Sequence, residues 1–143
     1  MDWYKKELFQ AGSSNVFVFG SNRAGRHGRG AAKFALDYCG AQYGNPFGPQ
    51  GQSFAIPTKS ENFRTLSLDE IEQYVRQFLY FAKQRQDLTF YITEIGCGLA
   101  GLQPIQIAPM FSDAPDNCIL PDRFKVKPEP LLLKDDNTNT STE

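Results

Sequence analysis

The chain has 143 residues and a formal net charge of -1, a size that suits one domain and leaves little room for a second. Its near-neutral charge argues against general nucleic-acid binding, which usually comes with a strong basic excess. No apolar run reaches the ~18–20 residues that span a bilayer, and no apolar segment of a signal peptide follows the first residues. We therefore expect a cytoplasmic protein without a membrane contact.

Short apolar segments alternate with helical patterns along the chain. Residues 16–19 form a wholly apolar run that ends at a glycine, as is typical of a strand buried on both faces. Apolar side chains at helical spacing predict a helix over residues 30–43. Residues 53–57 are predicted to form a second short strand.

The clearest helix is predicted from residue 68 to about residue 84. Ser67 and Glu70 have the S-x-x-E pattern of a capping box, which satisfies free N–H groups at a helix N-terminus. Apolar residues then repeat along one face of the helix. Residues 88–93 are predicted to form the next strand.

Two further elements complete the predicted domain. Pro104 suits the first turn of a helix that reaches about residue 113, because proline lacks an N–H that would have no partner there. Residues 117–120 are predicted to form the last strand. The alternation of strands and helices predicts an α/β fold, a three-layer αβα sandwich around a mixed, largely parallel sheet.

The composition changes near residue 125. We assign residues 1–124 to the domain and residues 125–143 to a C-terminal extension. From about residue 134 the extension is polar and cannot offset its ordering entropy by burial, so we expect it to be largely disordered.

Two glycine-rich loops each follow a predicted strand and precede a predicted helix. The first covers residues 20–32 and the second covers residues 95–102, Ile-Gly-Cys-Gly-Leu-Ala-Gly-Leu. Ligands of open α/β sheets bind beyond the carboxyl ends of the strands. Glycine lets several backbone amides approach one anion, and a helix N-terminus adds partial positive charge. Two such loops that face each other can hold the two phosphates of a pyrophosphate.

Two better-known phosphate motifs do not fit the first loop. Gly20 and Gly25 match GxxxxG, but Arg26 and His27 follow where a P-loop needs Lys and then Ser or Thr. The next glycines give G-x-x-G-x-G, which is not the GxGxxG order of a dinucleotide fingerprint. The alternative that these glycines only make tight turns stays open.

Basic residues gather at the first loop, in a stretch that contains no acid. A local patch in a neutral protein favours a small anionic ligand over a long polyanion. The residues of this basic patch are Arg23, Arg26, Arg29 and Lys33.

Three motifs, in this order, resemble the macro-domain family. Gly-Arg-Gly-Ala-Ala at 28–32 resembles the first ligand loop of macro domains. Phe-Ala-Ile-Pro-Thr-Lys at 54–59 resembles a strand that ends in a Thr-Lys pair, and residues 95–102 are close to the second phosphate loop. The last two motifs resemble the subgroup of the terminal ADP-ribose glycohydrolase and the ADP-ribose 1″-phosphate phosphatases. The resemblance covers about residues 15–121, and the chain also looks similar to an uncharacterised family of bacteria and their phages.

The resemblance implies a protein that binds ADP-ribose or a related ADP-ribosyl or cyclic nucleotide, as a reader or a sequestering protein, with no cofactor. Asn22 would contact the distal ribose; its alternative role is an Asx-turn that supports the loop. The implied ligand-binding residues are Gly20, Ser21, Asn22, Arg26, Gly28, Arg29, Gly30, Ala31, Thr58, Gly96, Cys97, Gly98, Leu99, Ala100 and Gly101.

A hydrolase of an ADP-ribosyl or ADP-ribose 1″-phosphate ester bond is the alternative function. Lys59 matches the lysine that acts at the anomeric carbon in the glycohydrolase, and its other reading is an ordinary surface lysine. Ala100 stands where that enzyme has its catalytic aspartate. His27 would then be the proton-transfer group near neutral pH, or merely a polar contact of its loop. A third hypothesis is an interaction domain that has lost its ligand.

Adenine is expected in an apolar cleft, stacked on one of four aromatic candidates, Phe19, Phe47, Phe63 and Phe111. The polar, proline-stiffened loop at 44–51 is long enough to serve as a lid over one end of the site.

The cysteines form no CxxC pair, so we expect reduced and mostly buried thiols. With one histidine in the chain, a zinc site is not expected.

Overall fold

A five-stranded sheet organises residues 4–125, the part of the chain that this computed structural model describes. The strand order is β2-β3-β1-β4-β5. β1, β3, β4 and β5 run parallel, and β2 lies antiparallel to β3 at one edge. The bounds are β1 (Asn15–Asn22), β2 (Gly48–Gln50), β3 (Ser53–Lys59), β4 (Thr89–Ile92) and β5 (Cys118–Ile119). The fold is therefore α/β with a mixed, mostly parallel sheet, which confirms the predicted fold class.

β1 lies at the centre of the sheet and is covered on both faces. Val16 and Val18 belong to the larger hydrophobic cluster on one face, whereas Phe17 and Phe19 belong to the smaller cluster on the other. All four side chains are buried. The wholly apolar sequence of this strand follows from this burial, since alternate side chains point to opposite faces of a sheet.

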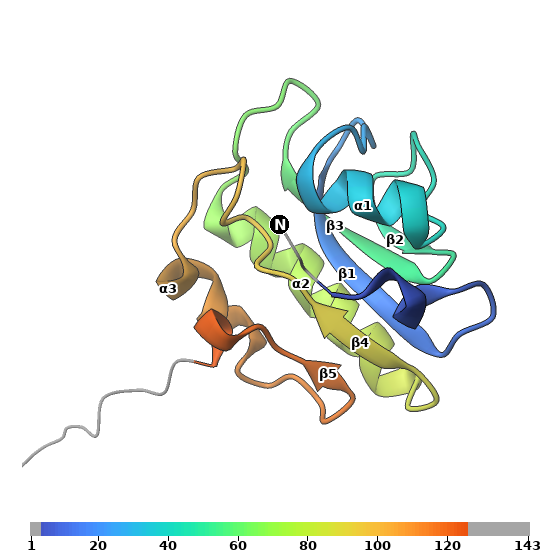
Figure 1. The fold of residues 1–143 in the computed structure, drawn as a ribbon. Coiled ribbons are helices and arrows are strands. Elements are labelled where there is room, and N and C mark those ends of the chain that lie inside the picture. The colour runs from blue at the N-terminus through green and yellow to red at the C-terminus, as the bar shows by residue number, and fades with distance from the viewer. Residues whose placement is uncertain (1–3, 126–143) are drawn as a thin grey trace, which may run out of the picture.

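Helices cover both faces of the sheet. α1 (Gly30–Tyr38) lies on the face with the smaller cluster and α2 (Leu68–Gln84) on the other, so that Figure 1 shows α1 in front of the sheet and α2 behind it. α3 (Pro104–Ile107) and the 3₁₀ turn η2 (Ala108–Phe111) join α2, while the 3₁₀ turn η1 (Lys6–Phe9) joins α1. The result is three layers. Within residues 4–125, no helix combines the length and the apolar character needed to cross a membrane.

α2 has the predicted bounds and the predicted cap. The Glu70 N–H donates to Ser67 Oγ at 3.2 Å, and the Ser67 N–H donates to Glu70 Oε1 at 3.0 Å. The two bonds form a complete capping box. The apolar face of the helix then packs on the sheet through Ile71, Val75, Phe78, Leu79 and Ala82.

Most other predicted elements exist with shifted ends. The first helix ends at Tyr38 rather than near residue 43, because Gly40 adopts a left-handed φ of 75° just beyond it. The helix that begins at Pro104 tightens into η2 after Ile107. The short 3₁₀ turn η3 (Asp122–Phe124) was not expected. The extension predicted to be disordered from about residue 134 lies outside the described residues.

The segment at 44–51 is not the predicted lid. Residues 48–50 form the edge strand β2, and the Gly44 N–H donates to the Gly25 carbonyl at 2.7 Å. Gly25 has a φ of 70°, and a Cβ added there would lie 2.4 Å from the Gly44 carbonyl carbon. This close backbone approach, which requires glycine at position 25, fixes the segment against the first loop.

We predict that Ser67→Ala lowers the free energy of unfolding by about 1 kcal/mol, because the N–H groups at the start of α2 lose their side-chain acceptor. Ser67→Thr keeps the hydroxyl and is the matched control. Urea denaturation of both variants measures the difference. Equal stability of the Ala variant and the wild type would show that the capping box does not stabilise α2.

Candidate functional site

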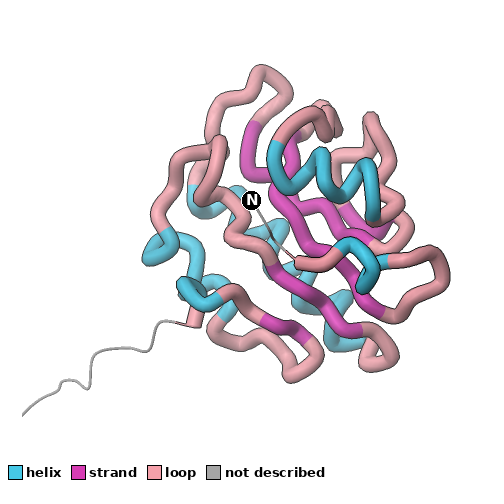
Figure 2. The backbone as a smooth tube through the Cα atoms, in the orientation of Figure 1, coloured by secondary structure: helices cyan, strands magenta, loops and turns pink. Residues whose placement is uncertain are grey.

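The segments that follow β1, β3 and β4 line one cavity of about 1070 Å³. These three strands are parallel neighbours, so their carboxyl ends meet at one edge of the sheet. Figure 2 shows the loops that leave these ends gathered beside that edge. The volume lies just above the range of about 300–1,000 Å³ that is usual for small-molecule pockets.

The cavity brings the two glycine loops together. Gly28 of the first loop and Gly98 of the second both line it, although they lie far apart in the sequence. Of the predicted site residues, His27 and Gly101 alone are not among its lining residues in the described part of the chain. The predicted residues that do line it are Gly20, Ser21, Asn22, Arg26, Gly28, Arg29, Gly30, Ala31, Thr58, Lys59, Gly96, Cys97, Gly98, Leu99 and Ala100.

The Asn22 side chain closes the turn at the start of the first loop. Its Oδ1 accepts from the Arg26 N–H at 3.1 Å, and its Nδ2 donates to the Arg26 carbonyl at 3.0 Å. The Gly25 N–H also donates to the Asn22 carbonyl, at 2.8 Å. These bonds give Asn22 the loop-supporting role that was the alternative to a ribose contact. The ribose contact itself stays a prediction.

The two loops and β3 meet at Gly20. A Cβ added to Gly20 would lie 3.5 Å from Thr58 Oγ1 and 3.6 Å from the Gly96 nitrogen. Thr58 is buried and donates its hydroxyl hydrogen to the Ser21 carbonyl at 3.3 Å. Thr58 therefore joins the ends of β1 and β3, and the second loop packs directly beside them.

Gly28 and Gly98 differ from the glycines that the fold requires. Neither has a left-handed φ, and a Cβ added at either position would meet no atom within 4 Å. A side chain at these positions would therefore enter open space rather than strain the backbone. Because both residues line the cavity, that open space is part of the cavity.

Three cations line the cavity without an acidic partner. No ion pair joins Arg26, Arg29 or Lys59 to a carboxylate of residues 4–125. Cations grouped around a cavity in this way attract an anionic ligand.

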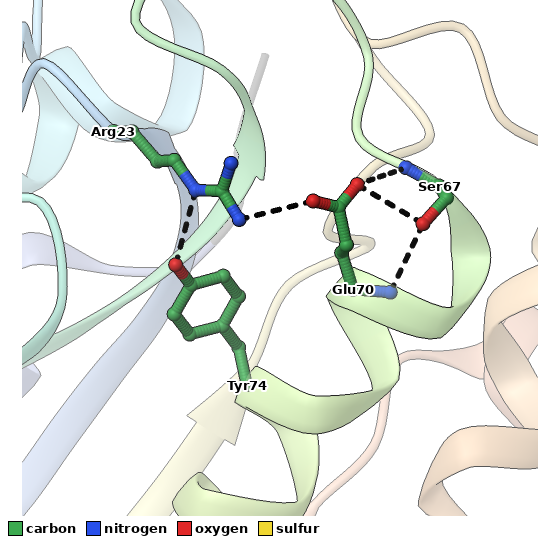
Figure 3. A network of polar contacts seen from close by, with 4 residues as sticks. All are labelled: Arg23, Ser67, Glu70 and Tyr74. Atoms are coloured by element: carbon green, nitrogen blue, oxygen red, sulfur yellow. Dashed lines mark hydrogen bonds and ion pairs between the residues drawn. The ribbon is translucent and has the colours of Figure 1, made fainter.

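The other half of the predicted basic patch has a structural role. Arg23 donates from Nη2 to Glu70 Oε2 at 3.2 Å and from Nε to the Tyr74 hydroxyl at 3.1 Å, which ties the first loop to the capped end of α2 (Figure 3). Lys33 pairs with Asp37 on α1 at 2.8 Å. Neither lines the cavity, so the patch splits into a structural half and a half that faces the site.

The predicted proton-transfer role of His27 needs correction. The imidazole is fully buried outside the cavity lining and packs edge-on against Phe19, with 5.1 Å between ring centroids. Its Nε2 lies 3.1 Å from the Asn45 carbonyl and 3.3 Å from Gln50 Oε1. Both partners are acceptors, so Nε2 carries the hydrogen. His27 thus turns inward to hold the 44–50 segment against the first loop.

An ion pair borders the β4–β5 side of the cavity. Arg123 donates from Nη2 and Nε to the two carboxylate oxygens of Glu94, at 2.6 and 3.0 Å. Arg123 thereby holds the pKa of Glu94 below its ordinary value. Burial, and then the Glu94 charge, raise the pKa of the Cys97 thiol. Glu94 is therefore ionised near neutral pH and unsuited to be a general acid, and Cys97 is protonated and a weak nucleophile.

Glu94 and Arg123 were missed by the sequence analysis for different reasons. Glu94 comes soon after β4, and a residue just beyond the carboxyl end of a strand can be predicted to lie near a ligand site. Arg123 reaches the cavity from η3, and no local sequence pattern indicates this. Two tyrosines, Tyr4 and Tyr43, also line the cavity and were missed, because both stand in segments without a recognisable motif.

Of the four aromatic candidates for adenine, Phe63 is the one that lines the cavity. Phe19 and Phe111 are buried in the two cores, and Phe47 packs against Phe54 and Tyr74. The structure thus leaves Phe63 as the one candidate able to contact a ligand there.

Comparisons with known proteins supply no function. No family model matches the chain, and no curated protein matches it. A solved structure of a protein of unknown function from Bacteroides thetaiotaomicron is similar, with a TM-score of 0.49 and 16% sequence identity over 70% of this chain and 79% of that chain. Because the function of that protein is itself unknown, the likeness gives none to this one.

We predict that the His27 imidazole titrates below its ordinary pKa of 6.5, because burial disfavours the charged form. His27 is the single histidine of the chain, so its ring protons report this pKa alone in an NMR titration. Between the lowered pKa and 6.5 the unfolded chain binds more protons than the folded one. The free energy of unfolding therefore falls as the pH drops through this window.

Urea denaturation at about pH 7.5 and about pH 5 tests the linkage. His27→Gln, which keeps a hydrogen-bond donor but does not titrate, should lose less stability on acidification than the wild type. An imidazole pKa at or above the ordinary value would contradict the assigned burial.

Proposed function

We propose that the protein binds ADP-ribose or a related ADP-ribosyl nucleotide in this cavity, as a macro-domain-like reader or sequestering protein. One observation supports the proposal above all. Two glycine loops that follow the neighbouring parallel strands β1 and β4 line one cavity, together with three cations that have no acidic partner in the described part of the chain.

The arrangement suits a diphosphate. Arg26 and Arg29 stand in the first loop, and the N-terminus of α1 at Gly30 adds partial positive charge. Backbone amides of both loops supply further donors around the same space. Hydrogen bonds from cationic donors to a phosphate contribute about 1.5–3 kcal/mol each, so a few of them account for micromolar binding.

The acid–base groups of the site favour binding over hydrolysis. Glu94 is the one acidic residue among the described lining residues, and both of its oxygens are held by Arg123. Ala100, at the position of the glycohydrolase aspartate, has no group that transfers a proton. Lys59 lines the cavity, but the described lining residues include no unpaired acidic side chain that could act with it.

We predict that ADP-ribose binds in isothermal titration and that Arg29→Gln weakens its affinity about tenfold, since one charge-assisted phosphate contact is lost. Lys33→Gln is the matched control: Lys33 is the next basic residue along the chain, but it pairs with Asp37 outside the cavity. The Lys33→Gln variant should bind ADP-ribose within about twofold of the wild type, because the exposed Lys33–Asp37 ion pair contributes little and lies outside the cavity.

Gly98→Val tests the second loop in the same assay. The added side chain would occupy the open space beside Gly98, so binding should be lost while the melting temperature stays unchanged. No heat with ADP-ribose or ADP would overturn the proposal. Turnover of ADP-ribose 1″-phosphate that disappears in Lys59→Ala would replace it with the hydrolase.

A further inference from the structure

The β3 side of the cavity presents an aromatic ring that recognition of a diphosphate does not use. Phe63 lines the cavity with 44% of its surface exposed. The Arg26 guanidinium lies over this ring, 5.6 Å from its centroid. An exposed ring paired with a guanidinium is a suitable surface for stacking a planar heterocycle.

The turn at residues 59–65 holds this ring in place. The Ser60 N–H donates to the Arg64 carbonyl at 2.7 Å, and the Phe63 N–H donates to the Ser60 carbonyl at 3.0 Å. The Thr65 hydroxyl donates to the Ala100 carbonyl at 2.7 Å. The turn is therefore tied to itself and to the second glycine loop.

Phe63 also adopts an unfavourable backbone conformation. Its φ of 64° makes it the one non-glycine residue of 4–125 in the left-handed region. A bulky residue rarely adopts this conformation, and such strain is concentrated at ligand sites, where the surrounding structure maintains it. The position would suit glycine or asparagine better, so the aromatic ring stands there despite the backbone strain.

A second exposed ring lies beside the first glycine loop. Tyr43 lines the cavity with 63% of its surface exposed, and its neighbour Gly44 is bonded to Gly25. Phe63 contacts the adjacent residue Arg26. The two aromatic side chains therefore both lie beside the first glycine loop.

The ring lies at one end of an elongated site. Along the sheet the order is β3-β1-β4-β5, and Phe63 follows β3, whereas Pro121 and Arg123 follow β5. Three strand spacings of about 4.8 Å separate the outer pair of strands, or about 14 Å in all. A diphosphate at the loops after β1 and β4 leaves room for a ring on each side.

We propose that the ligand is a dinucleoside diphosphate whose second base, attached to the ribose beyond the diphosphate, stacks on Phe63. This inference rests on the proposed function and names its ligand class. The charge on this side selects the base: Arg26, Arg29 and Lys59 repel a cationic ring such as a pyridinium and accept a neutral, electron-rich purine.

Three ligands that differ at one position test the inference. NAD⁺ and diadenosine diphosphate each add one ring to the distal ribose of ADP-ribose, a cationic nicotinamide in the first and a neutral adenine in the second. We expect diadenosine diphosphate to bind about tenfold more tightly than ADP-ribose, as one additional stacked base provides. NAD⁺ should bind no more tightly than ADP-ribose.

Variants at position 63 separate the ring from the backbone. Phe63→Asn tolerates the left-handed φ and should remove the roughly tenfold advantage in affinity of diadenosine diphosphate over ADP-ribose. Phe63→Tyr should keep the tight binding. Tyr80→Asn removes an exposed ring outside the cavity and should leave all three affinities unchanged.

The outcomes distinguish this inference from the function on which it rests. Binding of ADP-ribose with no gain for diadenosine diphosphate overturns the second-base site and leaves the proposed function standing. An equal loss for both ligands in Phe63→Asn does the same. Absence of binding by all three ligands overturns both.

Discussion

β1 pairs in parallel with β3 on one side and with β4 on the other, and this pairing brings the two glycine loops and the end of β3 to one edge of the sheet. Parallel neighbours end at the same edge of a sheet, so the segments that follow them open at one place. The strand is buried on both faces, with valines in one cluster and phenylalanines in the other, so a slip of one residue would exchange side chains of different size between the two clusters. Two loops distant in sequence thus become two walls of one cavity.

The residues around this cavity fall into those that hold the loops and those left to a ligand. Asn22, Thr58 and His27 form hydrogen bonds with the chain around them, and Arg23 joins the first loop to α2. The side chains of Arg26, Arg29 and Lys59 have no ion-pair partner in the described residues, and a Cβ added at Gly28 or Gly98 would meet no atom within 4 Å. A set of cations around open backbone matches the chemistry of a diphosphate.

The sequence predicted most of the fold and most of the cavity lining because their signals are local. The capping box of α2, the apolar β1 run and the two glycine loops can each be recognised within a short window. The roles of single side chains were harder to predict, because they depend on partners far along the chain. The two roles predicted for His27, proton transfer or a polar contact of its loop, are distinguished by Asn45 and Gln50, which lie far along the chain and hold the imidazole. The pairing of Arg123 with Glu94 likewise joins two segments that no motif connects.

NMR of the ¹⁵N-labelled protein titrated with ADP-ribose tests the central claim most directly, that both glycine loops grip one ligand. We predict that the backbone amides of residues 28–31 and 96–101 shift together, with one common dissociation constant. Exposed amides at the far end of the sheet, such as those of residues 11–14, should stay in place. Shifts confined to one loop, or a different dissociation constant for each, would contradict the account.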